Sequence, residues 1–311
     1  MNVMGTLVRR ELWEHRAITL APIAFAALFV AVNLLAALGV VKVQIDSGDM
    51  DLAGLVSSLD GRKAGALLQL GLAMVAISLN TVMVFVTVFY LLDCLYAERK
   101  DRSILFWKSL PVSDTRIVGS KLLTATVAVP LVTLAVFVGA SICMYAITGL
   151  AVQFAGSSDV LGAGPAAIAE VTLTHVYALA VQTLWYLPLF GWLLLVSAWS
   201  RRAVLLWAVL PPVAVNVVER IAFGTSHFAE LLKERLVGVY PLAFTEDPGR
   251  HHLLWQYKDE YANVDLKFSE GLLQLLDPGK LLADPGLWSG IAVAAAFFAA
   301  AVWMRRYRDD S

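Results

Sequence analysis

The sequence predicts an all-α integral membrane protein with six transmembrane helices and with both termini on the cytoplasmic side. Of its 311 residues, 59% are hydrophobic and only 16% are charged, whereas soluble domains carry about 25% charged residues. Apolar runs long enough to cross a bilayer, about 20 residues, recur along the chain. Lys and Arg gather in alternate connecting segments, which is the distribution that orients membrane proteins.

Five of the apolar runs contain no Lys or Arg. They cover residues 17–41, 67–92, 122–150, 173–199 and 287–304. Even the shortest of them lies within the range of about 17–25 residues that a spanning helix requires.

The remaining run, residues 203–218, is weaker. Pro211 and Pro212 interrupt it, and Glu219 and Arg220 close it after about 16 apolar residues. Without this crossing, the basic stretch at residues 304–308 would lie outside, against the positive-inside rule. We therefore expect it to cross the membrane.

The distribution of basic residues supports this topology. With six crossings, the two short outside loops contain only Lys42, Arg62 and Lys63. The positive-inside rule is evaluated from the Lys and Arg residues in short loops such as these. The inside segments contain fourteen bases: Arg9, Arg10, Arg16, Arg99, Lys100, Arg102, Lys108, Arg116, Lys121, Arg201, Arg202, Arg305, Arg306 and Arg308.

The chain is predicted to form one transmembrane domain, residues 1–311, with three notable segments outside the spans. Residues 1–16 are expected to form an interfacial helix, because the apolar residues Met4, Leu7, Val8 and Leu12 share one helical face. Glu11 projects into that apolar stripe and makes it imperfect.

Residues 220–286 are expected to form an extracytoplasmic element. The segment carries more acids than bases and many aromatic residues, which favours a folded element over a disordered tether. Its apolar residues Phe228, Leu231, Leu232, Leu236 and Val239 fall at helical spacing. Two interpretations stay open, a helix on the outer membrane surface or a lid that guides a substrate.

Motifs for chemistry are absent from the sequence. It has no G-x-x-x-x-G-K-[ST], no H-E-x-x-H and no G-x-S-x-G, so we expect no phosphate-binding loop, catalytic site or cofactor in this chain. Adjacent His251 and His252 are more typical of a solvated loop than of a metal site. Cys94 and Cys143 are too few for a disulfide framework. Nothing in the sequence suggests nucleic-acid binding.

The cytoplasmic segment 93–121 contains the densest charged patch, "ERKDRSILFWKSLPVSD", from Glu98 to Asp114. Its apolar part can form about two helical turns, which Pro111 stops, and Ser113 is a candidate N-cap for the next helix. Insertion of its aromatic residues among lipid headgroups is one interpretation. Acids interleaved with the bases favour a surface that docks a protein.

The extended stretch "ERKDRSILFWKSLPVSDTRIVGSK" resembles the second cytoplasmic segment of ABC-2 type transporter permeases. The matching residues are Glu98, Arg99, Ser109, Pro111, Ser113 and Lys121. Many members have Gly-Thr where this chain has Arg102 and Ser103. The resemblance implies that the segment forms a coupling helix in a cleft of a separate P-loop ATPase subunit, which binds ATP and Mg²⁺.

In such a complex, Ile104, Phe106 and Trp107 would form the apolar anchor of the coupling helix, and Glu98 and Arg99 are expected at its wetter rim. The resemblance further implies a second permease copy, either identical or related, and a location in the bacterial cytoplasmic (inner) membrane, in contact with lipid. The expected function is ATP-driven export of a hydrophobic or amphipathic compound such as a drug, peptide or lipid. The alternatives are a non-transporting six-span scaffold or assembly factor, and an intramembrane enzyme.

Overall fold

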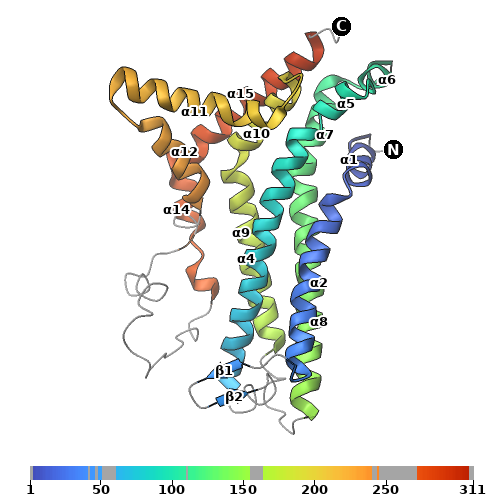
Figure 1. Ribbon diagram of the computed structural model, residues 1–311, viewed down its shortest axis with the longest axis vertical. Helices are drawn as coiled ribbons and strands as arrows, with labels where there is room; N and C mark the ends of the chain where they lie inside the picture. The colour runs from blue at the N-terminus through green and yellow to red at the C-terminus, as the bar shows by residue number, and fades with distance from the viewer. Residues whose placement is uncertain are drawn as a thin grey trace.

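The computed structural model describes residues 3–40, 43–45, 48–50, 61–109, 111–154, 164–239, 244 and 272–307. These residues are mainly helical, as the sequence predicts (Figure 1). The strands described, β1 (Val43–Ile45) and β2 (Gly48–Met50), form a short antiparallel hairpin in which Val43 pairs with Met50.

Within the described residues, six helical segments are long and apolar enough to cross a membrane, which confirms the predicted number. The first is α2 (Ala17–Ala37), and the second is α4 (Gly61–Asp93), which α5 (Tyr96–Lys100) follows. The third joins α7 (Asp114–Leu123), η1 (Thr124–Ala128) and α8 (Val129–Phe154). The others are α9 (Gly164–Trp185), α11 (Val204–Phe223) and α15 (Pro285–Tyr307).

Prolines account for two irregularities in these helices. The π-helical η1 ends two residues before Pro130, whose ring would clash with a carbonyl one turn earlier in a regular α-helix. The predicted run 173–199 is divided at Tyr186 into α9 and α10 (Leu187–Trp199), and Pro188 lies in the first turn of α10. Proline is tolerated there because that N–H has no partner within the helix.

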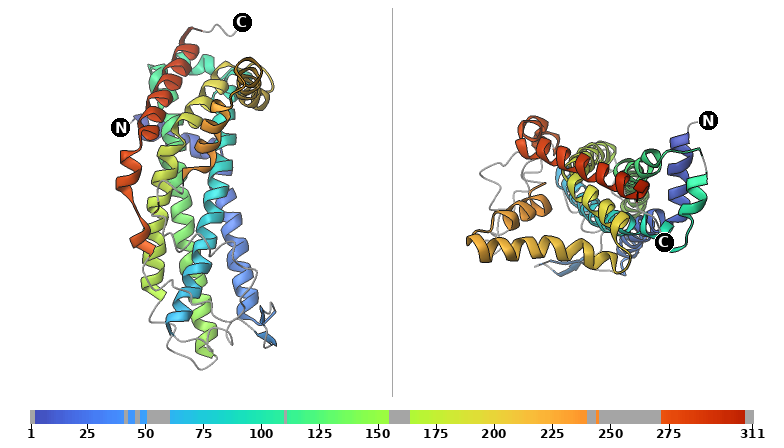
Figure 2. Two further views of the ribbon diagram at one scale, coloured as in Figure 1. Left: turned by 90° about the vertical axis from the view of Figure 1, so that its left-hand side faces the viewer. Right: turned by 90° about the horizontal axis from the view of Figure 1, so that it is seen from above.

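The direction of α11 differs from the prediction. Figures 1 and 2 show that α11 lies crosswise to the long axis of the bundle, at one end of it, instead of running alongside α4 and α8. Ala203 has a left-handed conformation with φ 50° and turns the chain before α11, and the indole N–H of Trp192 donates to the carbonyl of Ala208 at 3.0 Å. The helix is long and apolar enough to span, but it does not reach the opposite end of the bundle.

The two larger of the apolar clusters described hold the bundle together. One, around Leu72, Leu79 and Phe137, joins α2, α4, α8 and α9. The other, around Trp185 and Phe190, joins α4, α7, α9, α10 and α15. Because these side chains lie at internal faces, the outer faces of the same helices leave many large apolar residues exposed, as a protein surrounded by lipid requires.

The segments outside the spans are partly described. The predicted N-terminal helix is present as α1 (Val3–Glu14), which buries Leu7 and Glu11. Within residues 220–286, the described elements are α12 (His227–Val237), η3 (Leu272–Leu275) and α14 (Pro278–Ala283). In α12 Leu231 and Leu236 remain exposed, so the predicted apolar face is not fully packed. The His251 and His252 pair lies outside the described residues.

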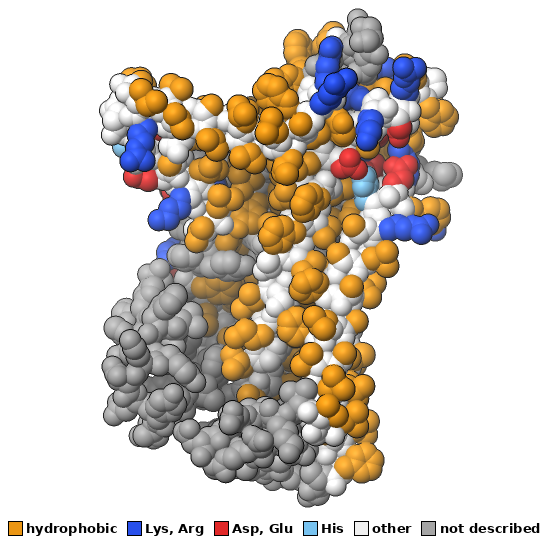
Figure 3. Space-filling view, viewed as in Figure 1, with side chains coloured by type: hydrophobic (Ala, Val, Ile, Leu, Met, Phe, Trp, Pro, Cys, Tyr) orange, Lys and Arg blue, Asp and Glu red, His pale blue; other side chains and the backbone are white. Residues whose placement is uncertain are grey.

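Among the described residues, charged side chains gather mainly at one end of the molecule. Figures 1 and 3 show α1, α5, α6 (Ile104–Ser109) and the C-terminal end of α15 at this end, with apolar side chains covering the shaft of the bundle. We call this the charged end. It contains segment 98–114, the densest charged patch of the sequence.

Candidate functional site

Segment 98–114 folds as a succession of short helices at the charged end. Arg102, with a positive φ of 61°, turns the chain between α5 and α6, and α7 then begins at Asp114. A left-handed residue other than glycine is uncommon and marks a tight turn. The helix predicted before Pro111 is therefore present, separated from α5 by a sharp corner.

The apolar residues of α6 point in two directions. Ile104 is 2% exposed, whereas Leu105 and Phe106 are 65% and 60% exposed. The guanidinium carbon of Arg10 lies 3.8 Å from the ring centroid of Trp107, an arrangement that favours attraction between the cation and the ring. The three residues expected to form one anchor are therefore divided, because Ile104 and Trp107 face the protein whereas Phe106 faces outward, as does its neighbour Leu105.

Glu98 of α5 and Lys121 of α7 form an ion pair in the interior. Glu98 is 4% exposed and Lys121 is 1% exposed, and Lys121 Nζ lies 2.9 Å from Glu98 Oε1. The expectation that Glu98 lies at a wet rim is therefore wrong. Its carboxylate faces inward because a matching ammonium group lies there.

Arg305, in the last turn of α15, approaches the same carboxylate from the other side. Its Nη1 donates to Glu98 Oε2 at 2.6 Å, and its Nε donates to Asp114 Oδ1 at 3.1 Å. A guanidinium group can serve two carboxylates at once because its N–H donors point in different directions. This links the C-terminal helix to both α5 and α7.

Glu11 extends the arrangement to the N-terminal helix. Its Oε1 accepts from Lys121 Nζ at 2.9 Å, and its Oε2 accepts from the Tyr90 hydroxyl at 2.9 Å. Glu11 is 2% exposed, so the carboxylate that interrupts the apolar stripe of α1 is buried against its partners.

Together these groups form a connected set of three carboxylates and three cations, which we call the ionic cluster. It comprises Glu11, Glu98, Asp114, Arg10, Lys121 and Arg305. Arg10, its most peripheral member, lies 4.0 Å from Glu98 and pairs more closely with Glu14, at 2.6 Å. Buried charges are tolerated only when they are paired and hydrogen-bonded. The cluster fixes α1, α5, α7 and α15 relative to one another at the charged end.

Arg99 lies outside the cluster and joins α5 to the end of α10. Its guanidinium donates to the carbonyls of Ser197 and Ser200, the latter at 2.9 Å. The Ser197 hydroxyl in turn accepts the backbone N–H groups of Leu95 and Tyr96, both at 3.1 Å. A cation at the last carbonyls of a helix is stabilising, so Arg99 anchors the α4–α5 corner to α10.

The remaining predicted site residues are more peripheral. Ser109 is exposed and its hydroxyl donates to the carbonyl of Phe106 at 2.7 Å, while Pro111 is exposed after the end of α6. Ser113 occupies the predicted N-cap position of α7 with extended backbone angles, but its side chain makes no capping hydrogen bond. The structure therefore brings Glu98 and Lys121 together and leaves these three at the surface.

Sequence reasoning missed Arg305, Arg10 and Tyr90 as partners of the site. It recorded Glu11 only as a flaw in an apolar stripe. That flaw was the available signal, because a carboxylate on the buried face of an amphipathic helix requires a cation opposite it. The identity of the cation was not readable, since Lys121 lies 110 positions away along the chain.

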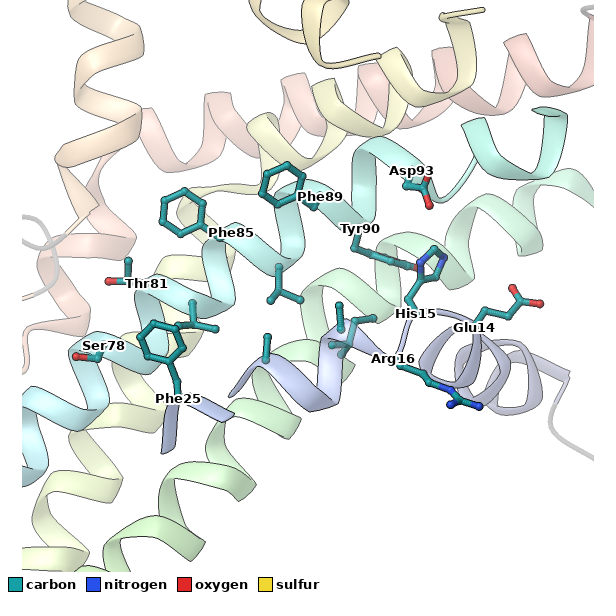
Figure 4. Close-up of a pocket in the computed structure, with 15 residues that line it drawn as sticks. Glu14, His15, Arg16, Phe25, Ser78, Thr81, Phe85, Phe89, Tyr90 and Asp93 are labelled. Atoms are coloured by element: carbon teal, nitrogen blue, oxygen red, sulfur yellow. The ribbon is translucent and has the colours of Figure 1, made fainter. Parts of the chain in front are cut away.

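A cavity of about 840 Å³ opens beside the ionic cluster, between the α1–α2 turn and one face of α4 (Figure 4). Its lining passes from Phe25 and Phe85, which are apolar, to Arg16 and Asp93, which are charged. Tyr90 connects the two sites, because its ring lines the cavity while its hydroxyl binds Glu11.

The described residues contain no group of three or more His, Cys, Asp or Glu side chains that could hold a metal ion. Comparison with known proteins finds no matching family model, no matching curated protein and no matching solved structure. The resemblance of the segment around Glu98 to ABC-2 permeases therefore stays a prediction.

Proposed function

We propose that this chain is the membrane-spanning permease subunit of an ATP-driven ABC-2 type transporter in the bacterial cytoplasmic membrane. A separate P-loop ATPase subunit would bind ATP and Mg²⁺ and supply the energy. The observation that carries the proposal is the form of α6, which exposes Leu105 and Phe106 outward while Ile104 and Trp107 fix it to the protein. Exposed apolar residues beside polar ones are typical of a docking surface.

The ionic cluster supplies a physical route for coupling. Because Glu98 is bound by both Lys121 and Arg305, a displacement of α5 and α6 must move α7 and α15 with them or break buried ion pairs. Breaking such pairs is costly, so rigid movement is favoured. In this proposal the ATPase pushes on α6, and the helices that carry the cluster transmit the movement into the membrane.

The positive-inside rule supports a cytoplasmic location for the charged end. The cluster brings Glu11, Glu98 and Arg305 together, so the N-terminal helix, the loop and the C-terminal helix share one side. Residues 220–286 would then be extracytoplasmic. A second permease copy would complete the unit, and hydrophobic or amphipathic cargo fits a chain with no charged residue near the centre of the predicted spans.

The test replaces Leu105 and Phe106 together by Ala. Apolar anchors at the centre of an interface contribute about 2 kcal/mol or more each, so the loss of both should lower the affinity for the ATPase about 700-fold if their contributions add, and about 30-fold if only one of them is central. Stimulation of ATP hydrolysis by cargo should be lost with it. The measurements are the affinity for the co-purifying P-loop ATPase and the ATP hydrolysis of the reconstituted complex, while the isolated chain should hydrolyse no ATP.

The matched control replaces Leu231 and Leu236 by Ala. These residues are 60% and 52% exposed on α12, similar to the pair on α6, and their loss should leave the affinity unchanged. If the α6 variant assembles and responds like the unaltered protein, α6 contacts lipid instead of an ATPase. A scaffold would then be the better description of this chain.

A further inference from the structure

The cavity beside the ionic cluster is a slot that follows α4 from Ser78 to Asp93 (Figure 4). The fifteen helical steps from Ser78 to Asp93 span roughly 22 Å at 1.5 Å per residue. One leaflet of a bilayer, including its headgroup layer, is about 20–22 Å thick. The slot therefore has the length of one lipid molecule that lies parallel to the helices.

The part of the slot farther from the charged end is apolar. Phe25, Phe85 and Phe89 line it and are 46%, 61% and 60% exposed. The hydroxyls of Ser78 and Thr81 donate to backbone carbonyls of their own helix, at 2.8 and 3.0 Å, so they require no polar partner from a ligand. This part offers hydrocarbon contact only.

Part of the polar end is already paired within the protein. Glu14 accepts from Arg10 Nε at 2.6 Å. The ring of His15 lies edge-on to Tyr90 with centroids 4.9 Å apart, and its Nε2 lies 3.9 Å from Glu11 Oε2. Burial lowers the pKa of His15 although Glu11 opposes the shift, so the imidazole is neutral near pH 7.

The side chains of Arg16 and Asp93 remain available at this end to bind a ligand. Both side chains are exposed, and within the described part of the chain neither has a side-chain hydrogen bond or ion pair. They lie on opposite sides of His15, with Arg16 from the α1–α2 turn and Asp93 from the end of α4 (Figure 4). The polar end therefore presents one cation and one anion above an apolar slot.

We propose that this cavity binds one phospholipid whose headgroup carries both a phosphate and a primary ammonium group. Arg16 binds the phosphate through its guanidinium donors, and the Asp93 carboxylate accepts hydrogen bonds from the ammonium. One acyl chain lies along the phenylalanines of α2 and α4. This inference does not rest on the proposed function, because it concerns lipid bound to the chain alone.

The chemistry distinguishes lipids that have the same acyl chains. Phosphatidylethanolamine has N–H donors for Asp93, whereas phosphatidylcholine has a quaternary ammonium group without donors. Phosphatidylglycerol has the phosphate for Arg16 but no cation for Asp93. A hydrogen bond to a charged group corresponds to about tenfold or more in affinity, so this difference is measurable.

The experiment is native mass spectrometry of the full chain, purified without an ATPase and incubated with each of the three lipids. We expect one phosphatidylethanolamine per chain, preferred about tenfold over the other two lipids. Asp93→Asn should abolish this preference while Glu234→Gln, an exposed acid on α12, should retain it. Arg16→Gln should weaken binding of all three about tenfold, whereas Lys100→Gln, an exposed base on α5, should not.

A third variant, Thr81→Trp, should fill the apolar part of the slot and remove the bound lipid without lowering the melting temperature, since Thr81 is exposed. Equal binding of phosphatidylethanolamine and phosphatidylcholine, or a preference that survives Asp93→Asn, would overturn the proposal. So would a lipid-free dimer that Thr81→Trp converts to monomers, because a second copy of the chain would then be the occupant.

Discussion

Lys121 lies between two carboxylates that come from different helices, with 1% of its residue surface exposed. Removing an ammonium group from water costs several kcal/mol even after the surroundings relax. The cost is offset here because Glu11 and Glu98 each lie 2.9 Å from Nζ. The arrangement favours a single packing of α1 against α5 and α7, since any other would leave charges buried without a partner.

Replacing Lys121 by Met keeps a similar side-chain length and removes the charge. Two carboxylates would then lie near each other, and Glu11 would retain the hydroxyl of Tyr90 at 2.9 Å and the imidazole of His15 at 3.9 Å but no fully charged partner. Loss of one partner from a buried ion pair costs about 3–5 kcal/mol, so we expect a marked fall in the melting temperature of the detergent-purified protein. Lys108→Met is the control, because Lys108 is exposed on α6; an equal fall in both variants would contradict a special role for Lys121.

The sequence predicted part of this site at the level of single residues. Glu98 and Lys121 were identified by motif, and both belong to the ionic cluster. Their burial was not predicted, because the charges around them suggested a solvated surface. Arg305 was counted only as a base near the C-terminus, since nothing in the sequence indicates that it contacts a carboxylate 207 positions earlier.

At the scale of whole elements, the most extensive contact between described helices involves α10 and α15. A Cβ atom added to Gly191 would lie 3.1 Å from the carbonyl of Ala294 and from Cβ of Phe297. Small residues allow helices to approach closely in membranes. Because α15 also carries Arg305, this contact determines how far Arg305 reaches toward Glu98.

We therefore expect Gly191→Leu to push α15 away from α10. Overpacking typically costs about 1–3 kcal/mol, and the displaced helix should also weaken the pair between Arg305 and Glu98. The matched control is Gly139→Leu in α8, where an added Cβ would meet no atom within 4 Å. Thermal unfolding of the two variants gives the measurement, and a smaller loss for Gly191→Leu than for Gly139→Leu would refute this role of the contact.

Element positions were largely predictable, because the length and hydropathy of a run directly report its capacity to span. The division of the fourth run was also signalled, by Pro188. The direction of α11 was not. Hydropathy measures how apolar a segment is but not its angle, and that angle depends on the turn at Ala203 and on the contact between Trp192 and Ala208.

At the scale of the whole molecule, the ionic cluster constrains topology. Glu11, Glu98 and Arg305 meet at the charged end, so the segments that carry them lie on the same side of any membrane that the bundle spans. The chain must then cross the membrane an even number of times between any two of these three residues. Whether α11 makes one of these crossings depends on the path of the chain from α10 to α15.

Cysteine accessibility in sealed cells tests this path. Ser226 follows α11 and Ser103 precedes α6. The proposed topology places Ser226 outside the cell and Ser103 inside. If α11 instead keeps the direction that it has in Figure 1, both residues lie on the cytoplasmic side. Cys94 and Cys143 are free thiols and would first be replaced by Ser. A membrane-impermeant maleimide should then label Ser226→Cys in intact cells and label Ser103→Cys only after the cells are opened. Labelling of Ser103→Cys from outside would contradict the orientation of the charged end, whereas protection of both positions would show that α11 stays at that end and that the crossing occurs later in the chain.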